Sequence, residues 1–277
     1  MGRIWVAAVA VLVLALAAVG ALFVTGLEEG TSRQGARVEH FTIDSAIVDR
    51  TLRATAVIPP GTDGRNRPLL VFLHGREGDE DSNLDGEMFL ALSQLGDRAP
   101  VVVFPSSGND SYWHDRLDGR WRAYVDNEVV VQAQARFGTD TGRVAVGGIS
   151  MGGFGAYNLA LRSHRRFCAV GGHSPALWTR FSLTAPGAFD NQADFKRHDL
   201  IRTARSHPRQ FARQPLWLDA GRRDPFDPGD RAFINALRKG HVRIRVRRWR
   251  GRHERSYWRA HWDSYLRFYA RALARCG

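Results

Sequence analysis

The segment Val144-Ala-Val-Gly-Gly-Ile-Ser-Met-Gly-Gly153 joins an apolar run to the stretch Phe154-Gly-Ala-Tyr-Asn-Leu-Ala-Leu161. The first half is typical of a buried strand and the second half of a helix. At their junction the sequence reads Gly148-x-Ser150-x-Gly152. A serine on such a tight turn needs glycines two residues away on either side, because side chains there would collide with the strand or the helix. The segment predicts that Ser150 is an exposed nucleophile at the amino end of a helix, where the helix dipole favours developing negative charge.

Two other interpretations of this turn are weaker. A phosphate-binding loop would require the pattern G-x-G-x-x-G or a Gly-Lys-Ser/Thr sequence, and the chain contains neither. The remaining alternative is a serine with a purely structural role in the turn.

Strand-like and helix-like segments alternate along most of the chain. The predicted strands are Val38–Ile47, Thr51–Pro59, Leu69–Leu73, Val101–Phe104, Val144–Val146, Cys168–Gly171, Leu216–Asp219 and Val242–Trp249. The predicted helices are Gly86–Leu95, Asp126–Phe137, Gly153–Arg162, Pro228–Lys239 and Ser256–Arg275. The first two strands are expected to pair antiparallel, and the later apolar runs to fill a buried parallel sheet. The alternation predicts one α/β domain with a mostly parallel central sheet flanked by helices, and chemistry at the carboxyl ends of the strands.

A nucleophilic serine needs a histidine base that an acid orients, and in this architecture the order along the chain is serine, acid, histidine. Four aspartates fall in or after the strand that begins at Leu216. Asp219 ends that strand, Asp227 is expected to cap the following helix, and Asp230 falls in its first turn. Asp224 lies in the loop and has no capping role, so it is the predicted acid.

Three histidines follow this acid in the chain. His241 precedes its strand and therefore lies at the wrong end of the sheet, and His261 is predicted to lie inside the final helix. His253 falls in the loop after the last strand, from which an imidazole can reach the serine, so it is the predicted base. The earlier histidines expected to be loop or packing residues are His74, His114 and His173.

Composition and charge place the chain among folded proteins with a basic C-terminal third. The 277 residues are 44% hydrophobic and 25% charged, which excludes disordered, collagen-like and coiled-coil chains. Residues 196–277 carry 22 Lys and Arg against 7 Asp and Glu, a balance of +15, whereas the other 195 residues stand at −3 and the whole chain at +12. This third is either a solvated basic face or a surface that contacts anionic lipid or cell-wall polymer. Nucleic acid is not expected, because the arginines are not organised around a recognisable binding module.

The N-terminus indicates export. Residues 4–27 contain no charged residue, and a run of this length can span a bilayer as a helix. Arg3 precedes the run, so the positive-inside rule predicts a single-pass cell-membrane protein with its catalytic domain outside the cytoplasm. The alternative is a signal peptide, cleaved near Ala15-Leu16-Ala17-Ala18, and a secreted protein. We expect an anchor or signal at residues 1–27, a linker at 28–38 and a catalytic domain at 39–277.

Cys168 and Cys276 are the two cysteines of the chain. In an oxidising exterior they can pair. The alternative, slightly favoured from sequence, is one buried thiol and one thiol in the C-terminal tail. Two cysteines also exclude a disulfide-built scaffold and a cysteine-rich metal module.

Several segments together resemble the esterase D / antigen 85-like branch of the α/β-hydrolases. The most specific are Gly148-Ile-Ser-Met-Gly-Gly-Phe-Gly-Ala-Tyr157, Gly221-Arg-Arg-Asp-Pro-Phe226 and Gly251-Arg-His-Glu-Arg-Ser-Tyr-Trp258. Further segments are Leu73-His-Gly-Arg-Glu-Gly78, Ser111-Tyr-Trp-His-Asp115 and Trp121-Arg-Ala-Tyr-Val125. The resemblance runs from about Val38 to the C-terminus. The branch includes S-formylglutathione hydrolases, feruloyl and acetyl esterases and mycolyltransferases.

The resemblance implies an exported serine carboxylic-ester hydrolase with the α/β-hydrolase fold and an acyl-enzyme intermediate. It implies that Ser150 attacks, His253 transfers the proton and Asp224 holds the imidazole. By the same resemblance, the backbone N–H groups of Met151 and Arg76 form the oxyanion hole. An apolar residue commonly follows this His-Gly, so Arg76 departs from the pattern and brings a charge to the mouth of the site.

Two other functions fit the same residues. One is a mycolyltransferase-type acyltransferase that moves an acyl group to a sugar or glycolipid. The other is a non-catalytic binding protein on the same fold, which would have no need for a complete triad. Substrate choice depends on loops such as Trp178–His198, which is either an apolar cap over the site or a plain surface loop. No cofactor or metal is expected: the pairs His114-Asp115 and His198-Asp199 are interpreted as surface contacts.

Overall fold

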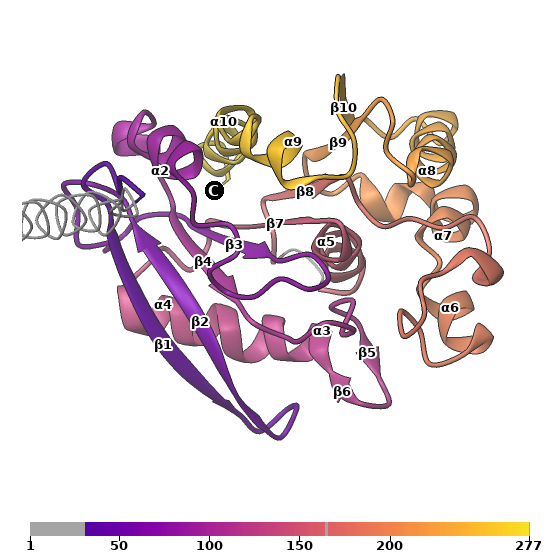
Figure 1. The fold of residues 1–277 in the computed structure, drawn as a ribbon, viewed down its shortest axis with the longest axis horizontal. Coiled ribbons are helices and arrows are strands. Elements are labelled where there is room, and N and C mark those ends of the chain that lie inside the picture. The colour runs from indigo at the N-terminus through magenta and orange to yellow at the C-terminus, as the bar shows by residue number, and fades with distance from the viewer. Residues whose placement is uncertain (1–30, 164–165, 277) are drawn as a thin grey trace, which may run out of the picture. The chain divides into compact units, whose positions relative to one another are not determined.

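An eight-stranded sheet forms the centre of the computed structural model, which describes residues 31–163 and 166–276 (Figure 1). Its strands are β1 (Arg37–Ser45), β2 (Arg50–Ile58), β3 (Leu69–Leu73), β4 (Val101–Pro105), β7 (Val144–Ile149), β8 (Ala169–His173), β9 (Leu216–Gly221) and β10 (Arg245–Trp249). The order across the sheet is β1-β2-β4-β3-β7-β8-β9-β10. The pairs β1–β2 and β2–β4 are antiparallel and the other neighbours are parallel. The predicted antiparallel opening and mostly parallel sheet are therefore confirmed.

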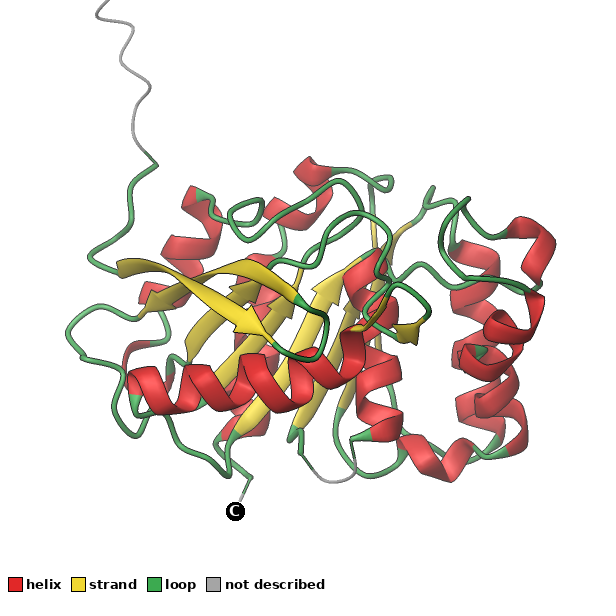
Figure 2. Ribbon diagram, turned by 90° about the horizontal axis from the view of Figure 1, so that it is seen from below, coloured by secondary structure: helices red, strands yellow, loops and turns green. Residues whose placement is uncertain are grey.

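Helices cover both faces of this sheet (Figure 2). They are α2 (Gly86–Ser93), α3 (Trp121–Tyr124), α4 (Val130–Phe137), α5 (Met151–Arg162), α6 (Gln192–His198), α7 (Leu200–Ser206), α8 (Asp227–Lys239), α9 (Arg255–Arg259) and α10 (Trp262–Leu273). A π-helical segment, Val125–Val129, joins α3 to α4, and a small two-stranded sheet is formed by β5 (Asp115–Arg116) and β6 (Gly119–Arg120). The apolar sides of α4, α5, α7 and α8 pack on one face, and those of α2 and α10 on the other.

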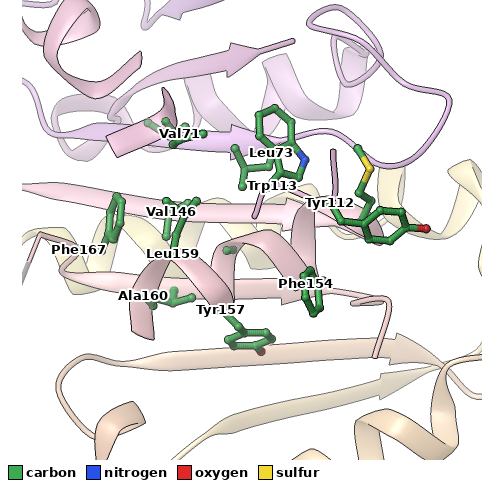
Figure 3. Packing of buried hydrophobic residues seen from close by; sticks show 14 of the residues in the cluster. Val71, Leu73, Tyr112, Trp113, Val146, Phe154, Tyr157, Leu159, Ala160 and Phe167 are labelled. Carbon is green, nitrogen blue, oxygen red and sulfur yellow. The ribbon is translucent and has the colours of Figure 1, made fainter. Parts of the chain in front are cut away.

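Alternate residues of each central strand enter the two cores. In β3, Leu69, Val71 and Leu73 belong to the core under α5, whereas Leu70 and Phe72 belong to the core under α10. This division follows from the period of two of an extended strand. Both faces are covered, so the strand is apolar at every position and buried throughout. Figure 3 shows the α5 side, where residues of α5 lie against Val71, Leu73 and Val146.

Two details of the predicted helices are wrong. The predicted helix Ser256–Arg275 is broken, because His261 leaves the helical conformation between α9 and α10 and stacks on Trp249, with ring centroids 3.9 Å apart. Asp227 is the first residue of α8 rather than its cap, and its carboxylate pairs with Arg231 and Arg248. Helices α6 and α7 were not predicted, although each begins after an Asn or Asp that caps it.

The predicted N-terminal anchor or signal, residues 1–27, lies outside the described residues. Strand β1 begins at Arg37, so the last two residues of the predicted linker belong to the sheet. No helix in the described part of the chain is long and apolar enough to cross a membrane.

Cys168 and Cys276 form a disulfide, with their Cα atoms 5.8 Å apart. The slightly favoured interpretation of two unpaired thiols is therefore wrong. Cys168 precedes β8 and Cys276 follows α10, so the bond ties the end of the last helix to the start of a central strand. The position of the end of α10 relative to β8 depends on tertiary packing, so the spacing of the two cysteines alone could not decide the pairing.

Candidate active site

Ser150 lies on a strained turn between β7 and α5. Its φ of 54° and ψ of −112° are values that residues other than glycine rarely adopt. Its backbone N–H donates to the His173 carbonyl at 2.9 Å, which holds the turn against β8. A Cβ on Gly148 would lie 2.5 Å from the Gly152 carbonyl carbon, and one on Gly152 would lie 2.6 Å from the Leu73 carbonyl carbon. Both glycines are thus required by close backbone packing, as the sequence pattern predicts.

The structure brings Ser150, His253 and Asp224 together. His253 lies in the loop between β10 and α9, and Asp224 lies in the loop after β9. The Nε2 atom of His253 is 2.8 Å from the Ser150 hydroxyl oxygen, and its Nδ1 atom is 3.0 Å from an Asp224 carboxylate oxygen. The Asp224 side chain is fully buried and the His253 side chain is 20% exposed. These distances allow a proton to pass between the serine and the imidazole.

Two aromatic rings contact the His253 imidazole. The ring centroids of Phe226 and Trp258 are each 5.0 Å from that of His253, and the Trp258 ring is perpendicular to it. Both residues lie within the family-like segments 221–226 and 251–258, but neither was predicted to have a role in the site. Their positions, two residues after Asp224 and five after His253, were the available signal.

The surroundings of Asp224 keep its carboxyl charged. Burial alone would raise the pKa of Asp224. The hydrogen bond and the charge interaction with His253 lower it, and so does the Phe226 backbone N–H, which donates to the carboxylate at 2.9 Å. Together these interactions outweigh burial. The pKa of Asp224 is therefore lowered. A charged carboxylate at this point fixes the proton on His253 Nδ1 and leaves Nε2 free to accept the serine proton.

The two predicted oxyanion-hole residues come from the start of α5 and from the loop after β3. Met151 is the first residue of α5, so its backbone N–H has no acceptor within the helix. The loop at Gly75 and Arg76 follows β3, and a Cβ on Gly75 would lie 3.5 Å from the Cβ of Ser150. The Arg76 guanidinium forms an ion pair with Asp110 at 3.2 Å, which neutralises the charge that departs from the family pattern.

His74 fixes the loop that carries Arg76. Its Nδ1 atom is 2.7 Å from the Gly75 carbonyl oxygen, its Nε2 atom accepts the Ser107 backbone N–H at 3.2 Å, and its carbonyl accepts the Trp113 indole N–H. Burial lowers the pKa of His74, so the ring stays neutral with its proton on Nδ1. The expectation that His74 has a loop role agrees with these contacts.

The other predicted candidates lie elsewhere. Asp219 is fully buried and accepts hydrogen bonds from the side chains of His173, Trp217, Tyr257 and Tyr265. Asp230 is buried in the first turn of α8, and burial raises its pKa well above the usual range. His241 lies at the surface before β10. None of these is bonded to Ser150.

Three of the four aromatic residues of the segment 178–198 are buried. Trp178, Phe189 and Phe195 are each less than 10% exposed. The Trp178 ring lies 5.5 Å from that of Phe226, which in turn contacts His253. The segment therefore packs beside the site and is not a plain surface loop, whereas an apolar cap over the site stays a prediction.

His114, Asp194 and His198 form a buried cluster, with potential metal-ligating atoms within 4.8 Å of one another. The interpretation of His114 and His198 as surface residues is therefore wrong. One Asp194 oxygen lies 3.1 Å from His114 Nε2, and the other lies 3.1 Å both from His198 Nδ1 and from Arg197. Because the carboxylate already meets these donors and the Arg197 charge, the cluster fits a hydrogen-bonded link between α6 and the loop before β5 better than a cation site.

Comparison with known proteins decides the family. The sequence model described as "Putative esterase" matches residues 45–269. The chain belongs to this esterase family. Its fold is that of the α/β-hydrolases: it superposes on a ferulic acid esterase with a TM-score of 0.75 at 19% identity, over 86% of this chain and 99% of the other. An S-formylglutathione hydrolase from Agrobacterium tumefaciens gives a TM-score of 0.72 at 20% identity, over 89% and 99%. The resemblance to the esterase D / antigen 85-like branch is confirmed.

Curated relatives carry the same description. Esterase Rv1288 of Mycobacterium tuberculosis is 29% identical over 122 residues, which are 41% of this chain and 26% of that protein. An acetyl esterase of Caldicellulosiruptor saccharolyticus is 31% identical over 119 residues, 42% of this chain and 44% of that protein. The matched region thus spans between a quarter and a half of the length of these relatives.

Proposed function

We propose that this protein is a serine carboxylic-ester hydrolase in which Ser150, His253 and Asp224 form the catalytic triad. The observation that carries the proposal is the unbroken pair of hydrogen bonds from the Ser150 hydroxyl through His253 to a buried carboxylate. Membership of the esterase family supports the same reaction class. Ser150 is half-buried, so part of the residue is open to solvent and to a substrate.

The first half-reaction forms an acyl-enzyme. The Ser150 oxygen bonds to the ester carbonyl carbon while His253 Nε2 takes the hydroxyl proton and the carbonyl electron pair moves onto oxygen. When that pair returns, the bond to the alkoxy oxygen breaks and His253 gives its proton to the leaving alcohol. Asp224 stays ionised and stabilises the imidazolium that forms in between.

In the second half-reaction water attacks the acyl-enzyme and Ser150 is the leaving group. His253 takes a proton from water as the oxygen attacks the acyl carbon, and then returns the proton to Ser150. In both halves the negative oxygen would accept hydrogen bonds from the backbone N–H groups of Met151 and Arg76. Losing one such donor typically costs about 10²–10³ in rate. An alcohol in place of water would make the protein an acyltransferase, which is the alternative function.

We also propose that the catalytic domain works outside the cytoplasm, held by residues 1–27 or released after their cleavage. The 24 uncharged residues at 4–27 support export. The Cys168–Cys276 disulfide supports it independently, because such bonds persist in oxidising compartments. The substrate is accordingly an ester met outside the cell membrane, either a small molecule or one derived from the envelope.

Hydrolysis of p-nitrophenyl esters from acetate to palmitate by the full chain tests the reaction. We expect turnover, and its loss by a factor on the order of 10⁶ in Ser150→Ala. The chain-length profile measures the depth of the acyl site. Product analysis with added sugar or glycolipid separates hydrolysis from acyl transfer. Equal rates in wild type and Ser150→Ala, or a folded wild type that turns over none of these esters, would contradict the proposed esterase.

A further inference from the structure

A cleft of about 560 Å³ opens at the edge of the sheet opposite the catalytic serine. Its wall includes Leu216, the first residue of β9, and Cys168, which directly precedes β8. Ser150 instead follows the last residue of β7. Strands β7, β8 and β9 are parallel, so their first and last residues lie at opposite edges of the sheet. The cleft is therefore separate from the proposed active site.

Five exposed arginines from three segments of the chain line this cleft. One comes from the loop before β9, two from the start of β10 and the residues before it, and two from the C-terminal end of α10: Arg213, Arg243, Arg245, Arg271 and Arg275. No Asp or Glu is among the lining residues that the structure describes. Five of the 22 basic residues of the C-terminal third thus line one concave surface.

These arginines differ from others on the same helices and strands. Arg248 of β10 and Arg267 of α10 each form an ion pair with a carboxylate, at 2.5 Å and 2.6 Å. Within residues 31–163 and 166–276, by contrast, no carboxylate forms an ion pair with Arg243, Arg245, Arg271 or Arg275. Arg245 makes a cation–π contact, since its guanidinium lies 5.9 Å from the Trp217 ring centroid. Several like charges without counter-charges favour an anionic ligand.

The floor of the cleft is apolar. Phe167, Leu216 and Phe268 line it, and all three are 6% exposed or less. The Cys168–Cys276 disulfide closes one side. A ligand that matches both parts carries a negative group for the guanidinium rim and an apolar portion for the floor. Guanidinium groups pair with phosphate oxygens through two parallel hydrogen bonds, which favours a phosphate as the negative group.

We propose that this cleft binds the head group of an anionic phospholipid, with the glycerol and first acyl carbons against the apolar floor. Binding there would turn the amino ends of the strands towards the bilayer and the edge that carries Ser150 away from it. The inference does not depend on the proposed esterase reaction, because it rests on residues of the other edge of the sheet.

Calorimetric titration of the full chain, in a neutral detergent, tests this proposal. The probes are dihexanoyl phosphatidylglycerol, dihexanoyl phosphatidylcholine and inorganic phosphate. The cleft variant is Arg243→Gln/Arg271→Gln, and the matched control is Arg205→Gln/Arg209→Gln, which removes two exposed arginines of residues 200–211. We expect phosphatidylglycerol to bind the wild type and the control alike, and the cleft variant about tenfold or more weaker.

Three results would overturn the proposal. Equal weakening in the cleft variant and the control would show diffuse attraction by net charge. Equal affinity for phosphatidylcholine and phosphatidylglycerol would show that the negative charge of the head group has no role. Equal affinity for inorganic phosphate and phosphatidylglycerol would show that the cleft binds a free anion and not a lipid. Thermal unfolding and p-nitrophenyl acetate hydrolysis of each variant serve as folding controls. A wild type that binds the lipid without hydrolysing esters would contradict only the proposed function.

Discussion

The side chain of Tyr269 occupies the space in which a Cβ on Gly147 would lie. The ideal Cβ position is 2.6 Å from the Tyr269 Cζ atom, and the same ring atom is 2.8 Å from a Cβ built on Gly171. Tyr269 therefore passes from α10 between two glycines on neighbouring strands, β7 and β8. Its hydroxyl reaches His173 Nε2 at 2.9 Å beneath the turn that carries Ser150.

Gly147→Ala should destabilise the fold. The added methyl group forces Tyr269 out of its position or moves a central strand, so we expect a loss of about 2 kcal/mol or more in the free energy of unfolding. Urea unfolding measures it. Gly142→Ala is the matched control, because its Cβ meets only an Asp140 oxygen at an ordinary 3.5 Å. Similar midpoints for the two variants would contradict the close packing.

Asp219→Asn should also destabilise the protein, for a different reason. The Asp219 carboxylate accepts four hydrogen bonds, at 2.6–2.9 Å, in a site closed to solvent. The NH2 group of an asparagine would face at least one of the four N–H and O–H donors and leave that donor without an acceptor. The loss costs about 2–3 kcal/mol. Asp263→Asn breaks an exposed pair with Arg267 and should cost well under 1 kcal/mol. Chemical denaturation of both variants gives the comparison, and equal losses would show that the network adds nothing.

Asp224→Asn should leave the fold intact and reduce kcat by about 10⁴. An amide in this position removes the charge that stabilises the imidazolium and no longer fixes the proton on His253 Nδ1. Asp227→Asn is the control, because Asp227 lies in the same segment but pairs with Arg231 and Arg248. Steady-state kinetics with p-nitrophenyl acetate tests both. If Asp227→Asn lost as much activity as Asp224→Asn, the acid would be misassigned.

Removing the disulfide should lower stability by about 2–5 kcal/mol. Cys168 and Cys276 are 108 residues apart, so the bond closes a long loop of the unfolded chain. Cys168→Ser/Cys276→Ser and the wild type in reductant should therefore unfold at the same lower urea concentration. If reductant left the urea midpoint of the wild type unchanged, the result would contradict the Cys168–Cys276 disulfide.

The sequence predicted the strands better than the helices, and the reason is physical. Buried strands such as β3 are continuous apolar runs, so their limits are visible in composition alone. The break at His261 depends instead on stacking with Trp249, a residue of another element, and α6 is too short and polar to show a period. Tertiary contacts of this kind leave no local pattern.

The candidate site shows the same division. Ser150, Asp224 and His253 could be chosen because each follows a strand and lies in a loop. The partners that hold them, such as Phe226 beside His253, come into contact only when the loops meet. The Asp194 carboxylate that joins His114 to His198 likewise lies 80 residues from one of its partners, beyond the range of any local pattern.

His114 should make stability depend on pH in the range where an ordinary histidine titrates. Burial lowers the pKa of His114, outweighing its hydrogen bond to Asp194, while His198 and Arg116 lower it further. The unfolded chain therefore binds a proton near pH 6.5 that the folded protein resists, and stability falls as the pH drops below that value.

His114→Gln should reduce the slope of unfolding free energy between pH 7 and 5 by up to about 1.4 kcal/mol per pH unit. Urea unfolding of the wild type and of His114→Gln at several pH values gives the two slopes. Asp194, whose pKa is lowered, adds its own loss only below the usual carboxylate range, so the two contributions separate by pH. A slope in His114→Gln equal to that of the wild type would mean that the buried ring accepts a proton without cost.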